Sequence, residues 1–166
     1  RFMMEIPIVV PNDDAIMSGL MFDTRFHDAD ALINTVQADV LKFDELNGFS
    51  SVIQKSVSAS PTLEKYALNL WKATRKPTEF SVKVTNVDMN RLVLAGASPR
   101  GMSMMLRAAR VNAWLNERTA ITPEDIHAVF HATVAHRIVF SPVYEMRRTE
   151  IAREMLSNIL NIVAAP

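Results

Sequence analysis

The sequence contains no cysteine, which excludes both a disulfide framework and a thiolate metal site. This absence suits a reducing compartment, and we expect a cytoplasmic protein. The net charge is zero, with 18 basic and 18 acidic residues, so composition gives no reason to expect a nucleic-acid partner. No apolar run approaches the roughly 18 to 20 residues that span a membrane, and we expect no membrane span.

Glycine is also scarce, with four residues at positions 19, 48, 96 and 101. The sequence contains no Gly-x-x-x-x-Gly-Lys-[Ser/Thr] phosphate-binding loop, because Met102 rather than lysine follows Gly101. The sequence also lacks an apolar strand ending in Asp-Glu, which would hold magnesium. Hydrolysis of a nucleoside triphosphate needs a phosphate cradle, a metal ion and a positioned water. We therefore expect that this chain does not carry out such hydrolysis alone.

What the sequence does contain is typical of a mostly α-helical bundle. Hydrophobic residues make up 49% and charged residues 22%, and apolar residues recur at helical spacing. Four Ser-Pro or Thr-Pro pairs predict helix starts, because Ser or Thr caps a helix and Pro fits its first position. These pairs are Ser60-Pro61, Ser98-Pro99, Thr122-Pro123 and Ser141-Pro142. We expect helices at about 12–21, 30–36, 44–55, 60–75, 102–118, 122–139 and 149–163.

The chain divides into three parts by pattern. Residues 1–11 alternate as a strand does, and we expect a short terminal strand left over from a truncated α/β core. Residues 12–60 read as a linker with short helices, and residues 61–166 as a helical domain. Within that domain, residues 77–90 have no helical period, and we expect an extended insertion or a short hairpin there.

The stretch from Gly96 to Gly101 is the strongest candidate site. Ser98 is the expected N-cap, Pro99 takes the first helical position and Arg100 the second. A helix N-terminus leaves backbone N–H groups free and has a positive dipole, so it can bind an anion. The guanidinium of Arg100 would strengthen such a site, and the two glycines let backbone approach closely. An ordinary solvated helix start remains the alternative interpretation.

Several motifs in order resemble the C-terminal lid of the MoxR family of AAA+ ATPases. They are Gly96–Arg100, Leu106–Ala109, Ile121–Ile126 and His136–Pro142, and Leu70–Arg75 is similar to the preceding helix. Arg1-Phe2 is similar to the segment that ends the family's nucleotide-binding core. The resemblance covers residues 60–75 and 91–163 well and residues 1–11 moderately.

The resemblance implies a nucleotide-responsive lid. It assigns the sensor-2 role, contact with the terminal phosphates of ATP, to Arg100. It places the arginine-finger role on Arg1 and nucleotide contacts on Ser98, Arg100 and Gly101. It further implies ATP and Mg²⁺ as cofactors of a full-length, chaperone-like parent. The implied partners are the parent's own N-terminal ATPase core, neighbouring subunits of a homo-oligomeric ring and an unidentified client protein.

Three alternatives come from other functional classes. Arg100, Arg107, Arg110 and Arg118 share one strip of their helix, which could serve a protein- or DNA-binding adaptor. A helical metal site could use Glu124, His127 and His131, which share a face, although the spacing differs from the usual zinc motif. A serine nucleophile at Ser98 is weaker, because the final glycine of a nucleophile elbow is replaced by Arg100.

Overall fold

The computed structural model describes residues 2–37 and 41–166. It divides into two compact units, one containing the first five residues with residues 50–166, and one containing residues 6–49. The described residues are mostly helical, which confirms the predicted fold class. Within the described ranges, none of the helices combines the length and the apolar character needed to cross a membrane.

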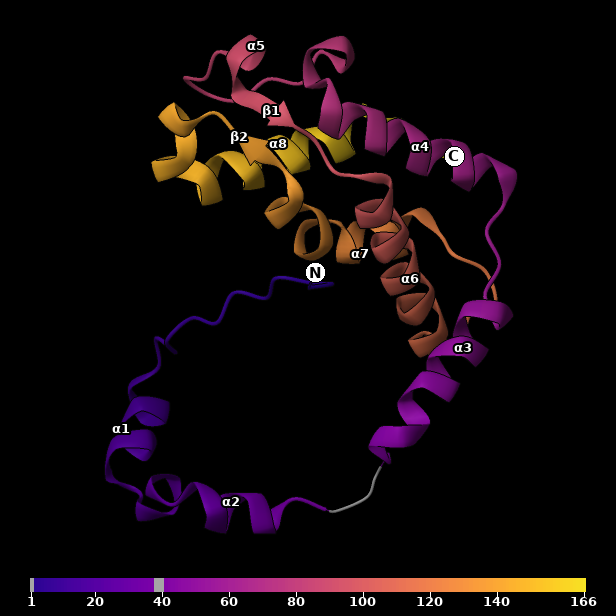
Figure 1. Cartoon of the computed structure of the whole chain (residues 1–166). Helices are drawn as coiled ribbons and strands as arrows, with labels where there is room; N and C mark the ends of the chain where they lie inside the picture. Colours follow the sequence, from indigo (N-terminus) through magenta and orange to yellow (C-terminus); the bar gives the residue numbers. More distant parts are fainter. Residues whose placement is uncertain (1, 38–40) are drawn as a thin grey trace. The chain divides into compact units, whose positions relative to one another are not determined.

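The larger unit is built on four long helices and a small sheet (Figure 1). In chain order its elements are α4 (Pro61–Arg75), η3 (Pro77–Phe80), α5 (Met89–Leu92), β1 (Val93–Ala95), α6 (Pro99–Leu115), α7 (Pro123–Val134), η4 (Ala135–Arg137), β2 (Val139–Phe140), η5 (Pro142–Arg147) and α8 (Arg148–Ile162). The helix α3 (Leu46–Ser56) joins this unit from residue 50 onward.

The Ser-Pro and Thr-Pro pairs begin helices as predicted. The Ser60 hydroxyl caps α4 by accepting a hydrogen bond from the Leu63 N–H at 3.2 Å. Thr122 and Asp125 form a reciprocal capping box at the start of α7, so two orphan donors are satisfied together. The pair Ser141-Pro142 begins the 3-10 helix η5, which leads directly into α8.

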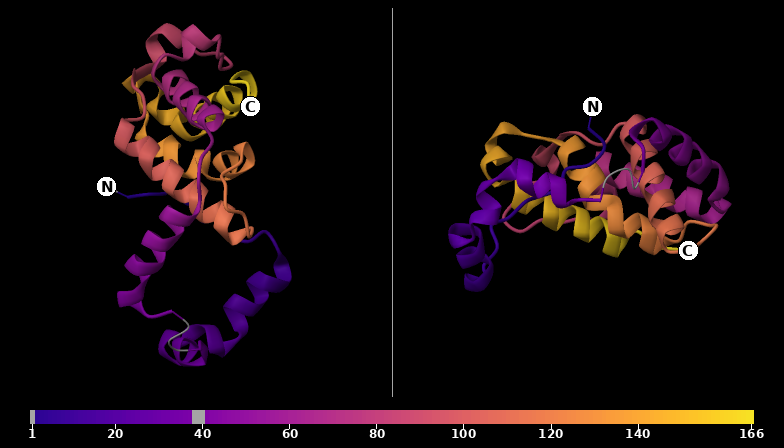
Figure 2. Two further views of the ribbon diagram at one scale, coloured as in Figure 1. Left: turned by 90° about the vertical axis from the view of Figure 1, so that its right-hand side faces the viewer. Right: turned by 90° about the horizontal axis from the view of Figure 1, so that it is seen from below.

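The core of this unit lies between α4, α6, α7 and α8. Each of these helices buries one apolar face, as their periodicity predicted, with Leu70, Met105, Phe130 and Met155 fully enclosed. The C-terminal residues lie near α4, because Ala164 and Pro166 line a pocket together with Tyr66 of α4. Figure 2 shows the ribbon of this unit from two further sides. One continuous core therefore holds the four helices together.

The prediction of a helix over 122–139 is wrong at its C-terminal end. The α-helix α7 ends at Val134, and the 3-10 helix η4 that follows it ends at Arg137. The Arg148 guanidinium donates to the carbonyls of Ala135 and Ile138, at 3.3 and 2.7 Å, and so satisfies groups exposed at the helix end. The chain then turns into β2, which pairs antiparallel with β1. The β-branched Ile138 and Val139 suit this extended conformation.

Residues 77–88 form η3 followed by an extended loop, rather than the hairpin that was the other expectation, and α5 begins at Met89. Val82 and Val84 alternate into the core, with 2% and 6% of their surface exposed. Two side chains of α8 hold the loop. Asn158 donates to the Lys83 carbonyl at 2.8 Å, and Glu154 accepts from the Thr85 N–H at 2.8 Å.

The strand expected over residues 1–11 is not formed within the described residues 2–11. A strand needs a neighbouring strand to satisfy its backbone groups, and the described part of the chain supplies none here. The segment instead makes one backbone hydrogen bond to the helical unit, from the Glu5 N–H to the Ala132 carbonyl at 2.7 Å.

The smaller unit contains short helices without a core. They are α1 (Asp14–Phe22), η1 (Thr24–His27), α2 (Ala29–Thr35) and η2 (Phe43–Glu45). Asp13 and Asp28 cap α1 and α2 as N-cap residues. None of the residues described within 6–49 is buried, and Phe22 and Phe43 are 76% and 88% exposed. Helices this short gain little stability without burial of an apolar face.

Candidate functional site

The turn before α6 is fixed to the end of α4. The Trp71 indole N–H donates to the Ala97 carbonyl at 2.8 Å. Gly96 lies so close to α4 that a Cβ there would be 2.6 Å from both the Arg75 Cα and the Thr74 carbonyl oxygen. Glycine is therefore required at this position by close backbone approach, as the sequence predicted. These contacts fix the position of the α6 N-terminus relative to the end of α4.

The first turn of α6 leaves one backbone donor free. The Ser98 hydroxyl accepts a hydrogen bond from the Gly101 N–H at 3.1 Å, and the Met102 N–H bonds to the Ser98 carbonyl at 3.1 Å. Pro99 has no N–H. Among the described residues, nothing accepts a hydrogen bond from the Arg100 N–H or from its exposed guanidinium. Both donors are available to an anion such as phosphate.

Ser98 acts as a helix cap in this geometry. Its hydroxyl oxygen is occupied by the Gly101 N–H, and Gly101 itself is buried. The two residues therefore shape the helix start, and Arg100 adds a free backbone N–H and a free guanidinium beside them. The serine-nucleophile alternative gains no support from this arrangement.

A second arginine, Arg137, lies at the same end of α6. A Cβ at Gly101 would be 2.8 Å from the Arg137 Cδ, so the side chain passes directly over the glycine. The Arg137 Nε donates to the Thr133 carbonyl at 2.8 Å. Its Nη2 donates to the carbonyls of Phe2 and Met3. Sequence reasoning missed this residue, although it belongs to the His136–Pro142 motif.

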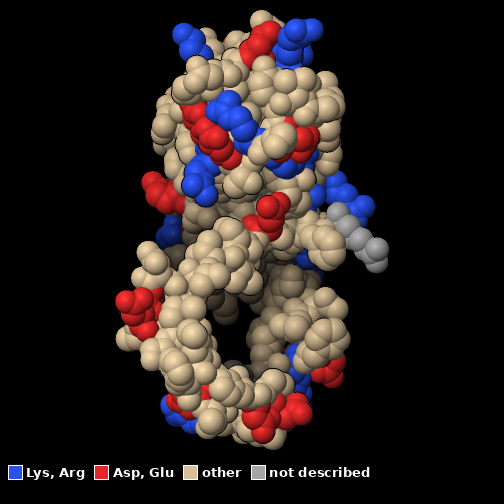
Figure 3. Space-filling model, turned by 90° about the vertical axis from the view of Figure 1, so that its left-hand side faces the viewer, with Lys and Arg blue, Asp and Glu red and all other residues tan. Residues whose placement is uncertain are grey.

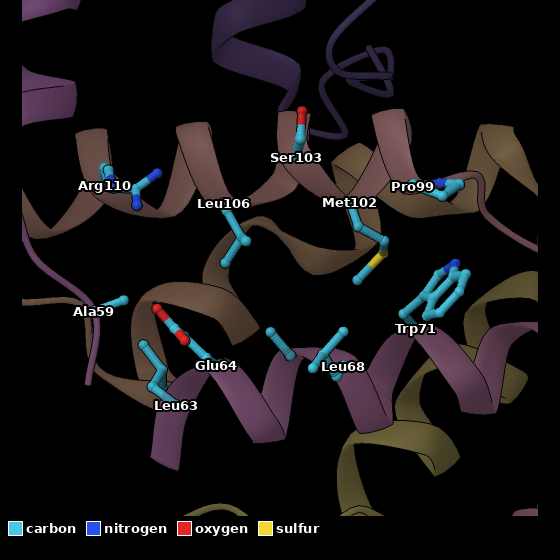
Figure 4. A pocket seen from close by; sticks show the side chains of 11 residues that line it. Ala59, Leu63, Glu64, Leu68, Trp71, Pro99, Met102, Ser103, Leu106 and Arg110 are labelled. Carbon is cyan, nitrogen blue, oxygen red and sulfur yellow. The ribbon is translucent and has the colours of Figure 1, made fainter. Parts of the chain in front are cut away.

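An apolar groove of about 400 Å³ lies between α4 and α6, next to the start of α6 (Figure 4). Met102 and Leu106 of α6 face Leu68 and Trp71 of α4 across it, and Leu68 is 54% exposed. Pro99 lines the groove as well. The groove therefore extends to Pro99, the residue before Arg100 at the start of α6.

The four arginines predicted to share one strip do not form one free surface, and Arg118 lies beyond the end of α6 at Leu115. Arg118 forms a bidentate pair with Asp125, with distances of 2.8 and 2.7 Å, and the Asp125 side chain is fully buried. Arg110 donates to the Val57 carbonyl at 3.1 Å. Arg107 is exposed and approaches Ser50 at 3.5 Å. On the face shown in Figure 3, basic and acidic side chains are interspersed.

Asp125 remains ionised because its hydrogen bonds outweigh its burial. Burial raises the pKa of the carboxyl group, but the Thr122 N–H, the Asn112 amide and the Arg118 guanidinium all donate to it and hold the pKa below its usual value. The pair with Arg118 is therefore present at neutral pH. Arg118 is thus engaged in joining the end of α6 to the start of α7.

The histidines considered for a metal site have separate partners. The Tyr66 hydroxyl and the His127 Nε2 are 2.7 Å apart, and the His131 Nε2 is 3.2 Å from the Arg153 carbonyl oxygen. Burial, followed by the nearby Glu124 carboxylate, raises the pKa of Tyr66. Across residues 2–37 and 41–166, no three His, Cys, Asp or Glu side chains are grouped so that they could hold a metal ion.

Arg1, the predicted arginine finger, lies outside the described residues. Its neighbours Phe2 and Met3 are described, and both are held by Arg137. The His136 Nε2 also lies 3.4 Å from the Phe2 carbonyl oxygen.

Comparison with known proteins places these features in a family. Residues 89–158 match the family model of the AAA lid domain. All 166 residues align with Protein MoxR of Methylorubrum extorquens at 44% identity and with Protein MoxR of Paracoccus denitrificans at 38%, spanning 48% and 49% of those proteins. The crystal structure of a candidate ATPase from Cytophaga hutchinsonii matches the whole chain and 47% of its own length, with a TM-score of 0.76 and 26% identity. The chain spans about half the length of these relatives.

Proposed function

Because this chain belongs to the MoxR family of AAA+ ATPases and includes its lid domain, we propose that Arg100 is the sensor-2 arginine of a ring ATPase. The observation that carries the proposal is the pair of free donors at the start of α6, the Arg100 N–H and its exposed guanidinium. The contacts of Gly96 and Ala97 with α4 hold those donors in place.

A nucleotide phosphate fits the chemistry of this helix start. The free N–H lies at the positive end of the helix dipole, where a negative charge is stabilised. A guanidinium can add two parallel hydrogen bonds to phosphate oxygens. ATP, when bound in the full-length parent with Mg²⁺, supplies the phosphoryl group that is transferred. The contribution of this chain is to bind and orient a terminal phosphate through Arg100, with Ser98 and Gly101 setting the backbone.

The shared core of α4, α6, α7 and α8 explains how a phosphate contact can act at a distance. Helices packed around one continuous core move together, so a change at the start of α6 is passed to the whole unit. We propose that this motion communicates the nucleotide state to a neighbouring subunit of a homo-oligomeric ring, and through it to a client protein.

The exposed apolar side chains of the smaller unit favour a contact with another part of the parent protein. Its helices expose large apolar side chains, and no described residue of the unit is buried. Exposed apolar surface of this kind is typical of a segment that packs against another part of a protein. We propose that residues 6–49 pack against the ATPase core of the parent.

ATP turnover by the full-length parent tests the proposal. Arg100→Ala should lower kcat at least about tenfold, because a hydrogen bond to a charged group contributes about one to two powers of ten. Arg153→Ala is the matched control, since Arg153 is exposed and its side chain makes no hydrogen bond to the described residues. Unchanged turnover in Arg100→Ala would show that the sensor-2 assignment is wrong.

A further inference from the structure

One side chain of α4, Trp71, is bonded to the turn that precedes α6. Its indole N–H donates to the Ala97 carbonyl at 2.8 Å. Ala97 is fully buried, and no other group among the described residues donates to its carbonyl. The helix begins at Pro99, so Arg100 follows the bonded carbonyl by only three residues. The position of Arg100 therefore depends on a hydrogen bond that Trp71 makes.

The indole ring of Trp71 is itself held by its neighbours. The guanidinium of Arg75, one turn later on α4, lies 5.5 Å from the ring centre, within the range of a cation–π contact. The ring is partly buried against the core and lines the groove between α4 and α6 beside Pro99 and Met102 (Figure 4). Because the ring is restrained in this way, its N–H points in one direction, toward the Ala97 carbonyl.

Tryptophan suits this position because it combines a large apolar ring with a single donor. Phenylalanine would fill much of the same space but would leave the buried Ala97 carbonyl without a donor, which is costly. The backbone contact at Gly96 limits how closely the turn approaches α4. The bond from Trp71 is directional, and it therefore also fixes the orientation of the turn.

We propose that Trp71 is a positioning residue for nucleotide binding, which holds the turn that places Arg100 against the terminal phosphate of ATP. The proposal rests on the function proposed above and adds a residue that acts through Arg100. Loss of the indole bond lets the start of α6 shift, and a shift of about an ångström weakens a contact that depends on the geometry of a guanidinium. The consequence concerns ATP, which carries the terminal phosphate, much more than ADP.

Equilibrium binding of ATP and of ADP to the full-length parent tests this inference. Trp71→Phe keeps an aromatic ring in the groove and removes the N–H donor, so it should weaken ATP binding about three- to tenfold and leave ADP binding nearly unchanged. Trp114→Phe is the matched control, because Trp114 is the other tryptophan of this chain and is 46% exposed. Its indole makes no hydrogen bond to the described residues, and the control should bind both nucleotides like the unmodified protein.

Combination with Arg100→Ala separates positioning from a general loss of stability. In an Arg100→Ala background, Trp71→Phe should cause no further loss of ATP affinity, because its effect passes through Arg100. A further loss of the same size in that background would overturn the inference and leave the sensor-2 role standing. An equal loss of ATP and ADP affinity in Trp71→Phe alone, or no loss of either, would have the same meaning. An ATP affinity unchanged by Arg100→Ala alone would instead refute the sensor-2 role, and this inference with it.

Discussion

Replacement of Arg118 by methionine tests whether this arginine, which follows the end of α6, stabilises the fold. The Asp125 carboxylate is fully buried and accepts two hydrogen bonds from Arg118, at 2.8 and 2.7 Å. Arg118→Met removes both bonds and leaves Asp125 with Asn112 and Thr122 as donors. Methionine keeps the length of the stem, so the change is mainly one of charge and hydrogen bonding.

The expected loss follows from the burial of the carboxylate. Breaking a buried ion pair by removing one partner costs about 3 to 5 kcal/mol. The Arg118 side chain is 36% exposed, so water screens part of the interaction, and we expect the lower end of the range, about 3 kcal/mol. For a chain of this size, that loss lowers Tm by roughly 6 to 12 °C.

Urea denaturation at pH 7, followed by circular dichroism, measures this loss in the free energy of unfolding. Arg147→Met is the matched control, because Arg147 forms an ion pair of similar length, 2.8 Å, with Glu150 on the exposed surface. Exposed pairs contribute little, so this variant should keep the stability of the unmodified chain. Equal stabilities of the two variants would refute the reasoning.

The pH dependence gives the same test a second form. The folded-state pKa of Asp125 is lowered, so the stability it contributes is fully present above the unfolded-state pKa of about 4. This contribution is lost as the pH falls through the folded-state pKa. The stability advantage of the unmodified chain over Asp125→Asn should therefore be constant near neutral pH and should shrink below about pH 4. An advantage that grows on acidification would contradict the assignment.

Two further predictions concern packing. Gly96→Ala should destabilise the chain by about 1 to 3 kcal/mol in the same denaturation assay, because the new methyl group meets backbone of α4. Gly19→Ala, with nothing within 4 Å of the added Cβ, should be neutral or stabilising, and similar losses in both variants would contradict this reading. In hydrogen exchange, amides of α1 and α2 should exchange far faster than those of α6, because neither short helix buries a residue. Comparable protection in all three helices would argue against it.

Local sequence chemistry was enough to predict where the main helices begin. A Ser or Thr cap followed by Pro satisfies one end of a helix with neighbouring residues alone, so Ser60, Ser98 and Thr122 could be identified from spacing. The end of α7 could not be predicted in this way. Its exposed carbonyls are satisfied by Arg148, which comes from the start of another helix.

In the candidate site too, some features follow from local sequence and others depend on contacts between distant residues. Periodicity placed Arg100, Arg110 and Arg118 on one strip, but the predicted helix over 102–118 was too long: α6 ends at Leu115, so its spacing holds for Arg100 and Arg110 and not for Arg118. Which of them remains free depends on residues from other parts of the chain, since Asp125 pairs with Arg118 and the carbonyl of Val57 binds Arg110. Arg137 was missed because its partners in the N-terminal segment are distant in sequence. Contacts between distant parts of the chain therefore determine which of the candidate arginines have partners in the fold.

The affinities of the full-length parent for ATP and ADP test the central proposal most directly. If Arg100 contacts a terminal phosphate, Arg100→Ala should weaken ATP binding by about tenfold or more and ADP binding much less, because the lost hydrogen bonds involve a charged group present only in ATP. Arg153→Ala should leave both affinities unchanged. An equal effect of Arg100→Ala on ATP and ADP, or no effect on either, would contradict the proposed role of Arg100.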